Sequence, residues 1–178
     1  MGRDETIIDI SVDGRAMTIH SRLVGGFNVE NILAAVSVGA ALGLTSDVIG
    51  SGLESVDAVP GRLERVNQPG EPLVVVDYAH TPDALVKALQ TVREITKGKV
   101  FCVFGCGGDR DPDKRPVMGE AVAKGADSAV VTNDNPRGEA PESIAQMIVP
   151  GLVTGGMQAG SVKNNKEYEI ELDRSLAI

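Results

Sequence analysis

The chain is poor in aromatic residues, cysteine and positive charge, and each shortage excludes a class of function. Aromatic residues make up 3% of the 178 residues and tryptophan is absent, so a surface that stacks nucleic-acid bases is not expected. The net charge is −8, whereas a general nucleic-acid binder needs a basic surface for phosphate contacts. The two cysteines are too few for a disulfide framework or a zinc site. We expect Cys102 in the core and Cys106 in a loop.

Long apolar segments are missing as well. No apolar run approaches the roughly 18–20 residues that a transmembrane helix needs, and we expect a cytoplasmic protein that binds neither a membrane nor nucleic acid. A hydrophobic content of 42% is enough for a core, and the length allows one or two domains.

The first part of the chain has the patterns of a β-hairpin and two helices. Residues 6–12 and 16–23 alternate in polarity around Asp13-Gly14, which is a typical hairpin turn. Residues 28–42 then carry apolar side chains at helical spacing, and Gly43 is a natural helix stop. The apolar positions of this expected helix are Val29, Ile32, Leu33, Val36 and Ala40.

A second helix and a turn are expected next. Thr45 or Ser46 can cap a short helix that runs to Leu53. Residues 59–62, Val-Pro-Gly-Arg, have the composition of a turn and a linker. The pattern changes after this turn, so we place a domain boundary between residues 56 and 57.

Beyond Leu63 the sequence alternates between strand-like and helix-like patterns. Short apolar runs rich in β-branched or aromatic side chains predict buried strands, and a segment with one apolar helical face follows each of them. The expected strands are residues 73–76, 100–104 and 128–131, and the expected helices are residues 82–95, 116–125 and 141–149. This alternation predicts an α/β fold with an open, mostly parallel, Rossmann-like sheet.

A polar motif follows each expected strand directly. The motifs are Asp-Tyr-Ala-His at residues 77–80, a glycine-rich loop that leads into three acids and three bases at residues 105–116, and Asn-Asp-Asn-Pro-Arg at residues 133–137. Right-handed crossovers between parallel strands place all three loops at the same edge of the sheet. Open α/β sheets bind ligands at this edge, so the sequence predicts one binding rim made of three loops.

Each motif also has a purely structural interpretation. Residues 77–83 can be only a strand end and a helix cap, with His80 as a surface imidazole, and residues 133–137 favour a turn. The glycine-rich loop is not a Walker A loop, because no Gly-Lys-Ser/Thr follows, and it lacks the dinucleotide-binding Gly-x-Gly-x-x-Gly pattern. On spacing alone, a functional site and a plain loop are about equally supported.

Taken together, the motifs resemble the Mur ligase family. The matching segments are residues 77–83, 104–111, 114–116 and 134–137, with residues 27–35 and 59–64 in the same order. The resemblance implies an ATP-dependent, amide-forming ligase of peptidoglycan synthesis, a step of cell-wall biogenesis that supports cell shape and cell division. Its reaction would add meso-2,6-diaminopimelate to UDP-N-acetylmuramoyl-L-Ala-D-Glu through an acyl phosphate, with Mg²⁺ offsetting phosphate charge.

The resemblance also implies roles for individual residues. Those assigned to ATP are Asn31 near the adenine, Arg62 towards phosphate, Asp77 towards ribose, and His80. Those assigned to the amino acid are Arg110, Asp134, Asn135 and Arg137. Arg137 can grip a carboxylate with two parallel hydrogen bonds, and Asp134 and Asn135 can receive an ammonium group. No residue of this chain is expected to be catalytic or to bind the metal ion.

The sequence also departs from the family pattern. It lacks the phosphate loop and magnesium ligands of the family's central domain, and it stops before a Gly-Lys-Gly-His-Glu motif. We therefore expect residues 1–56 to be a remnant of the central ATP-binding domain and residues 57–178 to be a truncated C-terminal amino-acid-binding domain. Without the N-terminal and central domains, such a fragment would be inactive. A ligase similar to folylpolyglutamate synthase and a non-catalytic binding module remain open alternatives.

Overall fold

The computed structural model describes residues 5–12, 14–68 and 70–178, and the chain forms two compact units. The first unit is Met1–Tyr78 and the second is Ala79–Ile178. Each unit is described by itself. The domain boundary expected between residues 56 and 57 stays a prediction.

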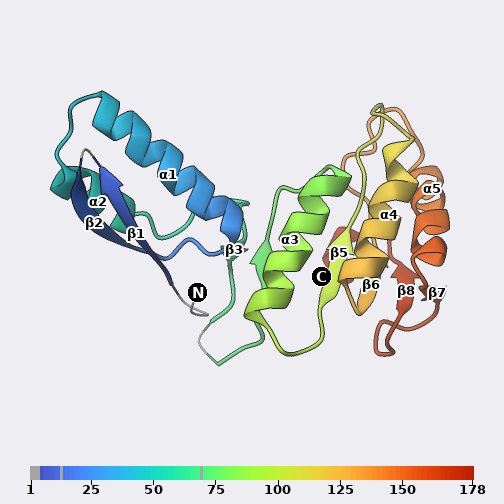
Figure 1. Cartoon of the computed structure of the whole chain (residues 1–178). Coiled ribbons are helices and arrows are strands. Elements are labelled where there is room, and N and C mark those ends of the chain that lie inside the picture. Colours follow the sequence, from blue (N-terminus) through green and yellow to red (C-terminus); the bar gives the residue numbers. More distant parts are fainter. Residues whose placement is uncertain (1–4, 13, 69) are drawn as a thin grey trace. The chain divides into compact units, whose positions relative to one another are not determined.

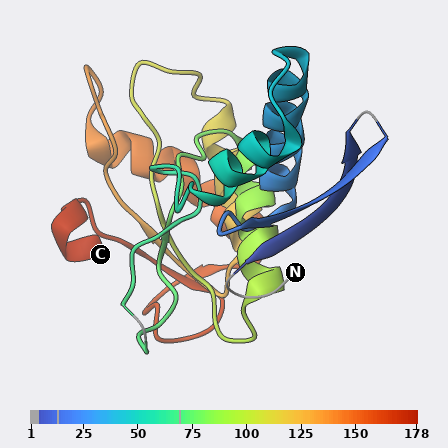
Figure 2. The same ribbon diagram turned by 90° about the vertical axis from the view of Figure 1, so that its left-hand side faces the viewer.

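The first unit contains the expected hairpin and two helices (Figure 2). Strand β1, Thr6–Val12, pairs antiparallel with β2, Arg15–Ser21. The turn between them includes Gly14 in the left-handed region at φ 77°, as expected for a tight hairpin, while Asp13 lies outside the described residues. Helices α1, Gly26–Ala41, and α2, Ser46–Glu54, cover the hairpin. The core residues are Ile8, Met17, Ile19, Ile32, Val36 and Ile49.

Helix α1 confirms the expected periodicity with one correction. Ile32 and Val36 are buried as expected, but Leu33 is 40% exposed and Gly39 takes its place in the buried stripe. Residues 32, 36 and 39 share one helical face, whereas residue 33 is turned about 100° away from it. Gly43 ends the helix as expected, at φ 78°, with its N–H bonded to the carbonyl of Ala40.

The strand expected at residues 73–76 does not join the parallel sheet. Instead β4, Val75–Val76, pairs antiparallel with β3, Glu64–Arg65, as a small separate ribbon. Val76 is 47% exposed, so the run is not a buried strand. A short apolar run indicates a strand but does not specify its partner strand. The prediction of three loops on one rim assumed that this run joins the parallel sheet, and that assumption was wrong.

The second unit is built on a parallel sheet, which confirms the expected fold class (Figure 1). The strand order is β5-β6-β8-β7, and each pair is parallel. The strands are β5 Phe101–Phe104, β6 Ser128–Val131, β7 Gln158–Ala159 and β8 Glu167–Ile170. Strands β7 and β8 had no sequence prediction, because their segments are short and polar.

Three long helices pack against this sheet. They are α3 Pro82–Ile95, α4 Lys114–Gly125 and α5 Pro141–Thr154. Helix α3 begins as expected, with Thr81 Oγ1 accepting a hydrogen bond from the N–H of Ala84. The predicted end of α5 at Val149 is wrong, because the helix continues through Pro150. Leu152, in the turn after Pro150, is buried in the core. The stabilisation from this packing outweighs the loss of the one backbone hydrogen bond that proline cannot donate.

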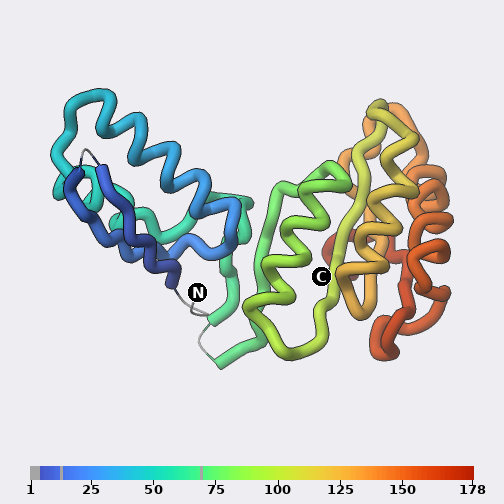
Figure 3. The backbone as a smooth tube through the Cα atoms, viewed as in Figure 1, coloured from blue at the N-terminus to red at the C-terminus, as the bar shows by residue number. Residues whose placement is uncertain are grey.

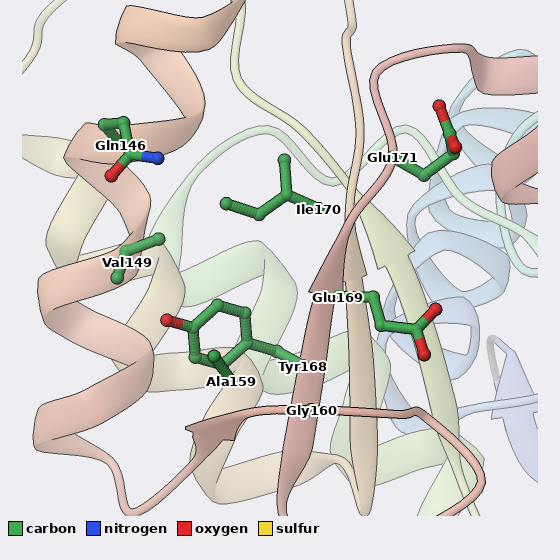
Figure 4. A pocket seen from close by; sticks show the side chains of 8 residues that line it. All are labelled: Gln146, Val149, Ala159, Gly160, Tyr168, Glu169, Ile170 and Glu171. Carbon is green, nitrogen blue, oxygen red and sulfur yellow. The ribbon is translucent and has the colours of Figure 1, made fainter.

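All three helices lie on the same face of the sheet. The core joins side chains of α3, α4 and α5 to Phe104, Ala129, Val131 and Tyr168 of the strands. In Figure 4, Tyr168 points from β8 toward α5, while Glu169 points to the opposite side. The other face of β5 carries Phe101 and Val103, which are 56% and 37% exposed, so the expectation that this whole run is buried is wrong.

A short C-terminal helix, α6 Arg174–Ala177, follows β8 and lies on the side of the strands away from α3 (Figure 1 and Figure 2). No helix within the described residues is long and apolar enough to cross a membrane.

Candidate functional site

Two loops meet where the neighbouring strands β5 and β6 end. We call residues 105–113, between β5 and α4, the glycine loop, and residues 133–140, between β6 and α5, the asparagine loop. Parallel neighbours end at the same edge of a sheet, so the loops emerge side by side (Figure 3). Ligands of open α/β sheets bind at such an edge.

Two glycines allow the loops to touch through their backbones. A β-carbon at Gly105 would overlap the carbonyl oxygen of Thr132, and one at Gly108 would overlap the carbonyl oxygen of Pro136. Both contacts are too close for any side chain. These two glycines therefore serve the close approach of the neighbouring chain segment, residues 132–136.

Hydrogen bonds join the loops at several points. The N–H of Gly108 donates to the carbonyl of Asn135 at 2.8 Å, and the N–H of Gly138 donates to Asp109 Oδ2 at 3.0 Å. Arg137 Nη1 donates to the carbonyl of Gly108 at 2.5 Å. Asp109 and Arg137 both have positive φ angles, 51° and 50°, which are uncommon for residues with side chains. The two loops form one cross-braced unit.

An ion pair between a buried arginine and a half-buried glutamate connects helix α4 to the asparagine loop. Arg115, in the first turn of α4, has no exposed side-chain area, and its Nη1 and Nη2 atoms donate to Glu139 Oε2 and Oε1 at 2.8 and 2.7 Å. Glu139 Oε1 also accepts a hydrogen bond from the N–H of Asp109 at 2.6 Å. The hydrogen bond from Arg115, together with that from Asp109, lowers the pKa of the Glu139 carboxyl from 4.5 to about 2. Glu139 is therefore a carboxylate at neutral pH.

Sequence reasoning missed Glu139, although a signal for it was present. Arg115 precedes Met118 by three residues and Val122 by seven, so helical periodicity puts the arginine on the same buried face. A buried arginine requires an acidic partner. The expected burial of Arg115 therefore indicated an acidic partner in a neighbouring loop, but the sequence did not identify which acid it is.

The four residues predicted to bind the amino acid all lie on the joined loops. Arg110 belongs to the glycine loop, and Asp134, Asn135 and Arg137 belong to the asparagine loop. All four are exposed. The arrangement therefore offers two guanidinium groups, which can bind carboxylates, and a carboxylate and an amide, which can accept hydrogen bonds from an ammonium group. Their roles stay predictions.

The residues predicted to bind ATP are more dispersed. In the first unit, Arg62 and Asp77 meet at one turn, where Asp77 Oδ2 accepts a hydrogen bond from the N–H of Leu63 at 2.9 Å. The Arg62 guanidinium carbon lies 5.6 Å from the ring centroid of Tyr78, within cation–π range. Arg62 also lines a hollow of about 170 Å³ together with two further arginines, Arg22 and Arg65.

The other two predicted ATP residues lie elsewhere in the chain. Asn31 is exposed on α1, where its Nδ2 atom donates to Asn28 Oδ1 at 3.3 Å. His80 belongs to the second unit, and its carbonyl accepts a hydrogen bond from Lys114 Nζ at 2.9 Å. The structure brings Arg62 and Asp77 together at one turn. Asn31 lies on α1, and His80 lies in the segment before α3.

The described part of the chain contains neither a cluster of metal-binding side chains nor a thiol with a lowered pKa. These residues include no group of three or more His, Cys, Asp or Glu side chains that could hold a metal ion. Both cysteines are free thiols. Burial raises the pKa of Cys102 to about 12 and that of Cys106 to about 11, so neither is activated as a nucleophile. Cys106 lies in a loop as expected, but it is buried, with its Sγ 3.6 Å from Met118 Sδ.

A second hollow, of about 620 Å³, lies beside β8 and α5 and contains none of the predicted site residues (Figure 4). Its lining residues are Gln146, Val149, Ala159, Gly160, Tyr168, Glu169, Ile170 and Glu171. The residues with candidate chemistry gather instead on the two loops beyond β5 and β6.

The fold and the paired loops define an α/β domain with a charged rim, and comparisons with known proteins identify its family. A model of the family described as "Mur ligase, glutamate ligase domain" matches residues 61–178. The chain belongs to the Mur ligase family.

Relatives of known name agree with this assignment. The UDP-N-acetylmuramoyl-L-alanyl-D-glutamate–2,6-diaminopimelate ligase of Geobacter metallireducens is 49% identical over 161 residues, covering 85% of this chain and 32% of the relative. The ligase of the same name from Syntrophomonas wolfei is 46% identical, covering 96% of this chain and 35% of the relative. The chain thus spans about a third of the length of the curated relatives it matches.

Solved structures agree as well. A structure of a UDP-N-acetylmuramoyl-L-alanyl-D-glutamate–2,6-diaminopimelate ligase matches 96% of this chain and 33% of its own, with 34% identity and a TM-score of 0.56. A UDP-N-acetylmuramate–alanine ligase from Thermotoga maritima matches with a TM-score of 0.69 and 25% identity. A folylpolyglutamate synthase from the same organism reaches a TM-score of 0.67 at 19% identity, which shows a shared fold alone.

Proposed function

We propose that the chain is the amino-acid-binding part of a ligase that adds meso-2,6-diaminopimelate to UDP-N-acetylmuramoyl-L-Ala-D-Glu. Mur ligases are ATP-dependent ligases. In the proposed reaction, ATP phosphorylates the side-chain carboxylate of D-Glu, and an amine of diaminopimelate then displaces phosphate to form the amide. The reaction belongs to peptidoglycan synthesis and takes place in the cytoplasm.

The observation that carries the proposal is the pair of joined loops that presents Arg110 and Arg137 beside Asp134 and Asn135. Diaminopimelate has two carboxylates and two amines, whereas lysine lacks the second carboxylate. Arg137 donates through Nη1 to the carbonyl of Gly108, which orients the guanidinium and leaves donors for a carboxylate. Asp134 and Asn135 complement the ammonium group. Relatives whose names contain diaminopimelate support the same substrate.

For the nucleotide, the proposal assigns Arg62 to phosphate and Asp77 to ribose, with Asn31 and His80 as further ATP contacts. Asp57 and Glu64 line the hollow together with the three arginines, so the phosphate assignment rests on the Arg62 guanidinium alone, which can bind a phosphate oxygen. Mg²⁺ would offset phosphate charge. Because the described residues contain no metal-binding cluster, we assign none of them to this ion.

A chimeric ligase tests the proposal. Residues 61–178 of this chain would replace the matching segment of the Geobacter metallireducens relative, and ADP release would be measured with the UDP-linked dipeptide and either meso-diaminopimelate or lysine. We expect turnover with meso-diaminopimelate and a large preference for it over lysine. A folded chimera that prefers lysine, or that is active only in extending folate with glutamate, would overturn the proposal.

A further inference from the structure

We infer that Glu139, clamped by Arg115, is the positioning residue that sets the distance between Arg110 and Arg137. This inference rests on the proposed function, since it assigns to Glu139 the geometry of the amino-acid site. Neither Glu139 nor Arg115 is proposed to touch the substrate. They act through the loops that carry the two arginines.

The position of Glu139 in the chain is the first support. It lies two residues after Arg137, and it accepts the N–H of Asp109, the residue directly before Arg110, at 2.6 Å. A single carboxylate thus connects the backbone next to one substrate-facing arginine to the loop segment that bears the other. Because Glu139 Oε1 and Oε2 are both bound by Arg115, the carboxylate is held in a fixed orientation.

Burial explains why this connection is rigid. The Arg115 side chain has no exposed area, and its Nε atom has no hydrogen-bond partner among the described residues. Its other polar contacts are weaker, a 3.4 Å hydrogen bond to the carbonyl of Gly107 and a 2.9 Å contact with Met147 Sδ. Glu139 is therefore the anion that balances a buried cation. Glu139 itself is 28% exposed, but losing it would leave the buried guanidinium without its anion, so the ion pair helps to hold the two loops together.

Backbone geometry is the third support. Arg137 has a positive φ of 50°, which costs free energy for a residue with a side chain. The N–H of the next residue, Gly138, donates to Asp109 Oδ2 at 3.0 Å, and Glu139 in turn accepts from the N–H of Asp109. This reciprocal pair of bonds holds Arg137 in its strained conformation. A preorganised site binds its ligand more tightly, because less conformational entropy is lost on binding.

The test is the Glu139→Gln variant in the chimeric ligase, with Glu142→Gln as a matched control. Gln keeps the shape of Glu139 but removes its charge and one acceptor, and Glu142 lies in the first turn of α5 outside these contacts. We expect the KM for meso-diaminopimelate to rise at least about tenfold in Glu139→Gln, as for the loss of a charge-assisted hydrogen bond. The KM for ATP should change less than about twofold, and Glu142→Gln should match the parent. Glu139→Asp, which keeps the charge, should recover part of the loss.

Hydrogen exchange in the 178-residue chain supplies a readout that needs no activity. In Glu139→Gln, the exchange rates of the Gly108, Asp109 and Gly138 amides should rise by a larger factor than those of the amides of β6 and α4. Unchanged exchange at the three loop amides would overturn the inference. So would faster exchange with an unchanged KM for meso-diaminopimelate, or an equal rise of both KM values.

The two proposals fail in different ways. A folded parent chimera that uses no diamino acid would overturn the proposed function, whatever Glu139 does. The exchange comparison would then still support or overturn the role of Glu139 in joining the loops. A parent that ligates meso-diaminopimelate, with a Glu139→Gln variant that matches it in both KM values, would overturn the positioning role alone.

Discussion

Gly108 packs directly against Pro136, so that a β-carbon at residue 108 would overlap the carbonyl oxygen of Pro136. The contact joins the glycine loop to the asparagine loop beside the hydrogen bond from the Gly108 N–H to the Asn135 carbonyl. Backbone atoms cannot swing aside as a flexible side chain can, so any larger residue must push the loops apart.

We therefore predict that Gly108→Ala destabilises the protein by about 1–3 kcal/mol, the range for overpacking of a closely packed site. Gly52→Ala is the control, since Gly52 lies within α2 and a β-carbon there meets no atom within 4 Å. Alanine in a helix interior is more favourable than glycine by about 0.5–1 kcal/mol, so Gly52→Ala should stabilise. Urea unfolding of both variants measures the two effects, and a Gly108→Ala variant as stable as the parent would contradict the close contact.

The second prediction concerns acid stability at the start of β6. Asp127 Oδ2 accepts hydrogen bonds from the N–H of Val100 at 2.8 Å and from Arg93 Nη2 at 2.9 Å. Burial alone would raise the pKa of Asp127, but the hydrogen bonds from Val100 and Arg93 outweigh burial and lower it below 3.8. A lowered pKa in the folded state gives stability that is present above about pH 4 and lost as the pH falls through the folded pKa.

Asp127→Asn should therefore lower Tm at pH 7, and the difference from the parent should shrink as the pH falls below about 4. Glu94→Gln, an exposed position on α3, serves as the control and should leave Tm nearly unchanged. Thermal unfolding followed by circular dichroism between pH 7 and pH 2.5 measures both. A difference that stays constant over this range would show that the Asp127 charge adds nothing to the fold.

Local sequence patterns predicted the elements of the fold better than they predicted its pairing. Polarity alternation, helix caps and β-branched runs placed the hairpin, α1, α2, α3, β5 and β6 correctly, because these signals are local. The run at residues 73–76 failed, since an apolar run does not specify its partner strand. Strands β7 and β8 were missed because their sequences carry no apolar pattern. They are strands because they pair with neighbouring strands in the folded protein.

The candidate site was predicted in composition but not in internal architecture. Arg110 and Arg137 could be assigned to one rim because both follow parallel strands. The ion pair between Arg115 and Glu139 could not be assigned, because it joins a helix to a loop 24 residues further on, and no local pattern specifies such a contact. The close approach of Gly105 and Gly108 to residues 132–136 was not predicted either, for the same reason.

The third prediction concerns nucleotide use. In the chimeric ligase, extended to include the first unit, Arg62→Ala and Asp77→Ala should each raise the KM for ATP about tenfold, the cost of one charge-assisted hydrogen bond. The KM for meso-diaminopimelate should change much less. Arg22→Ala is a matched control, because Arg22 lines the same hollow as Arg62 but is 69% exposed and paired with Asp57 at the surface. Surface pairs of this kind contribute little. Steady-state kinetics with each substrate varied in turn would refute the assignment if the KM for ATP stays at the parent value in both variants.

The last prediction concerns the choice between diaminopimelate and lysine. Arg137→Ala in the chimeric ligase should lower kcat/KM for meso-diaminopimelate at least about tenfold, because a lost charge-assisted hydrogen bond costs about 1.5–3 kcal/mol and each 1.4 kcal/mol is a factor of about ten. Lysine never had the second carboxylate, so its kcat/KM should change little. Arg137→Lys should fall in between, since an ammonium group cannot reproduce the two parallel hydrogen bonds of a guanidinium. The Arg137 hydrogen bond to Gly108 gives the competing explanation, in which Arg137 only braces the loops. An equal loss for both amino acids would show that bracing, and not recognition of the substrate, is its role.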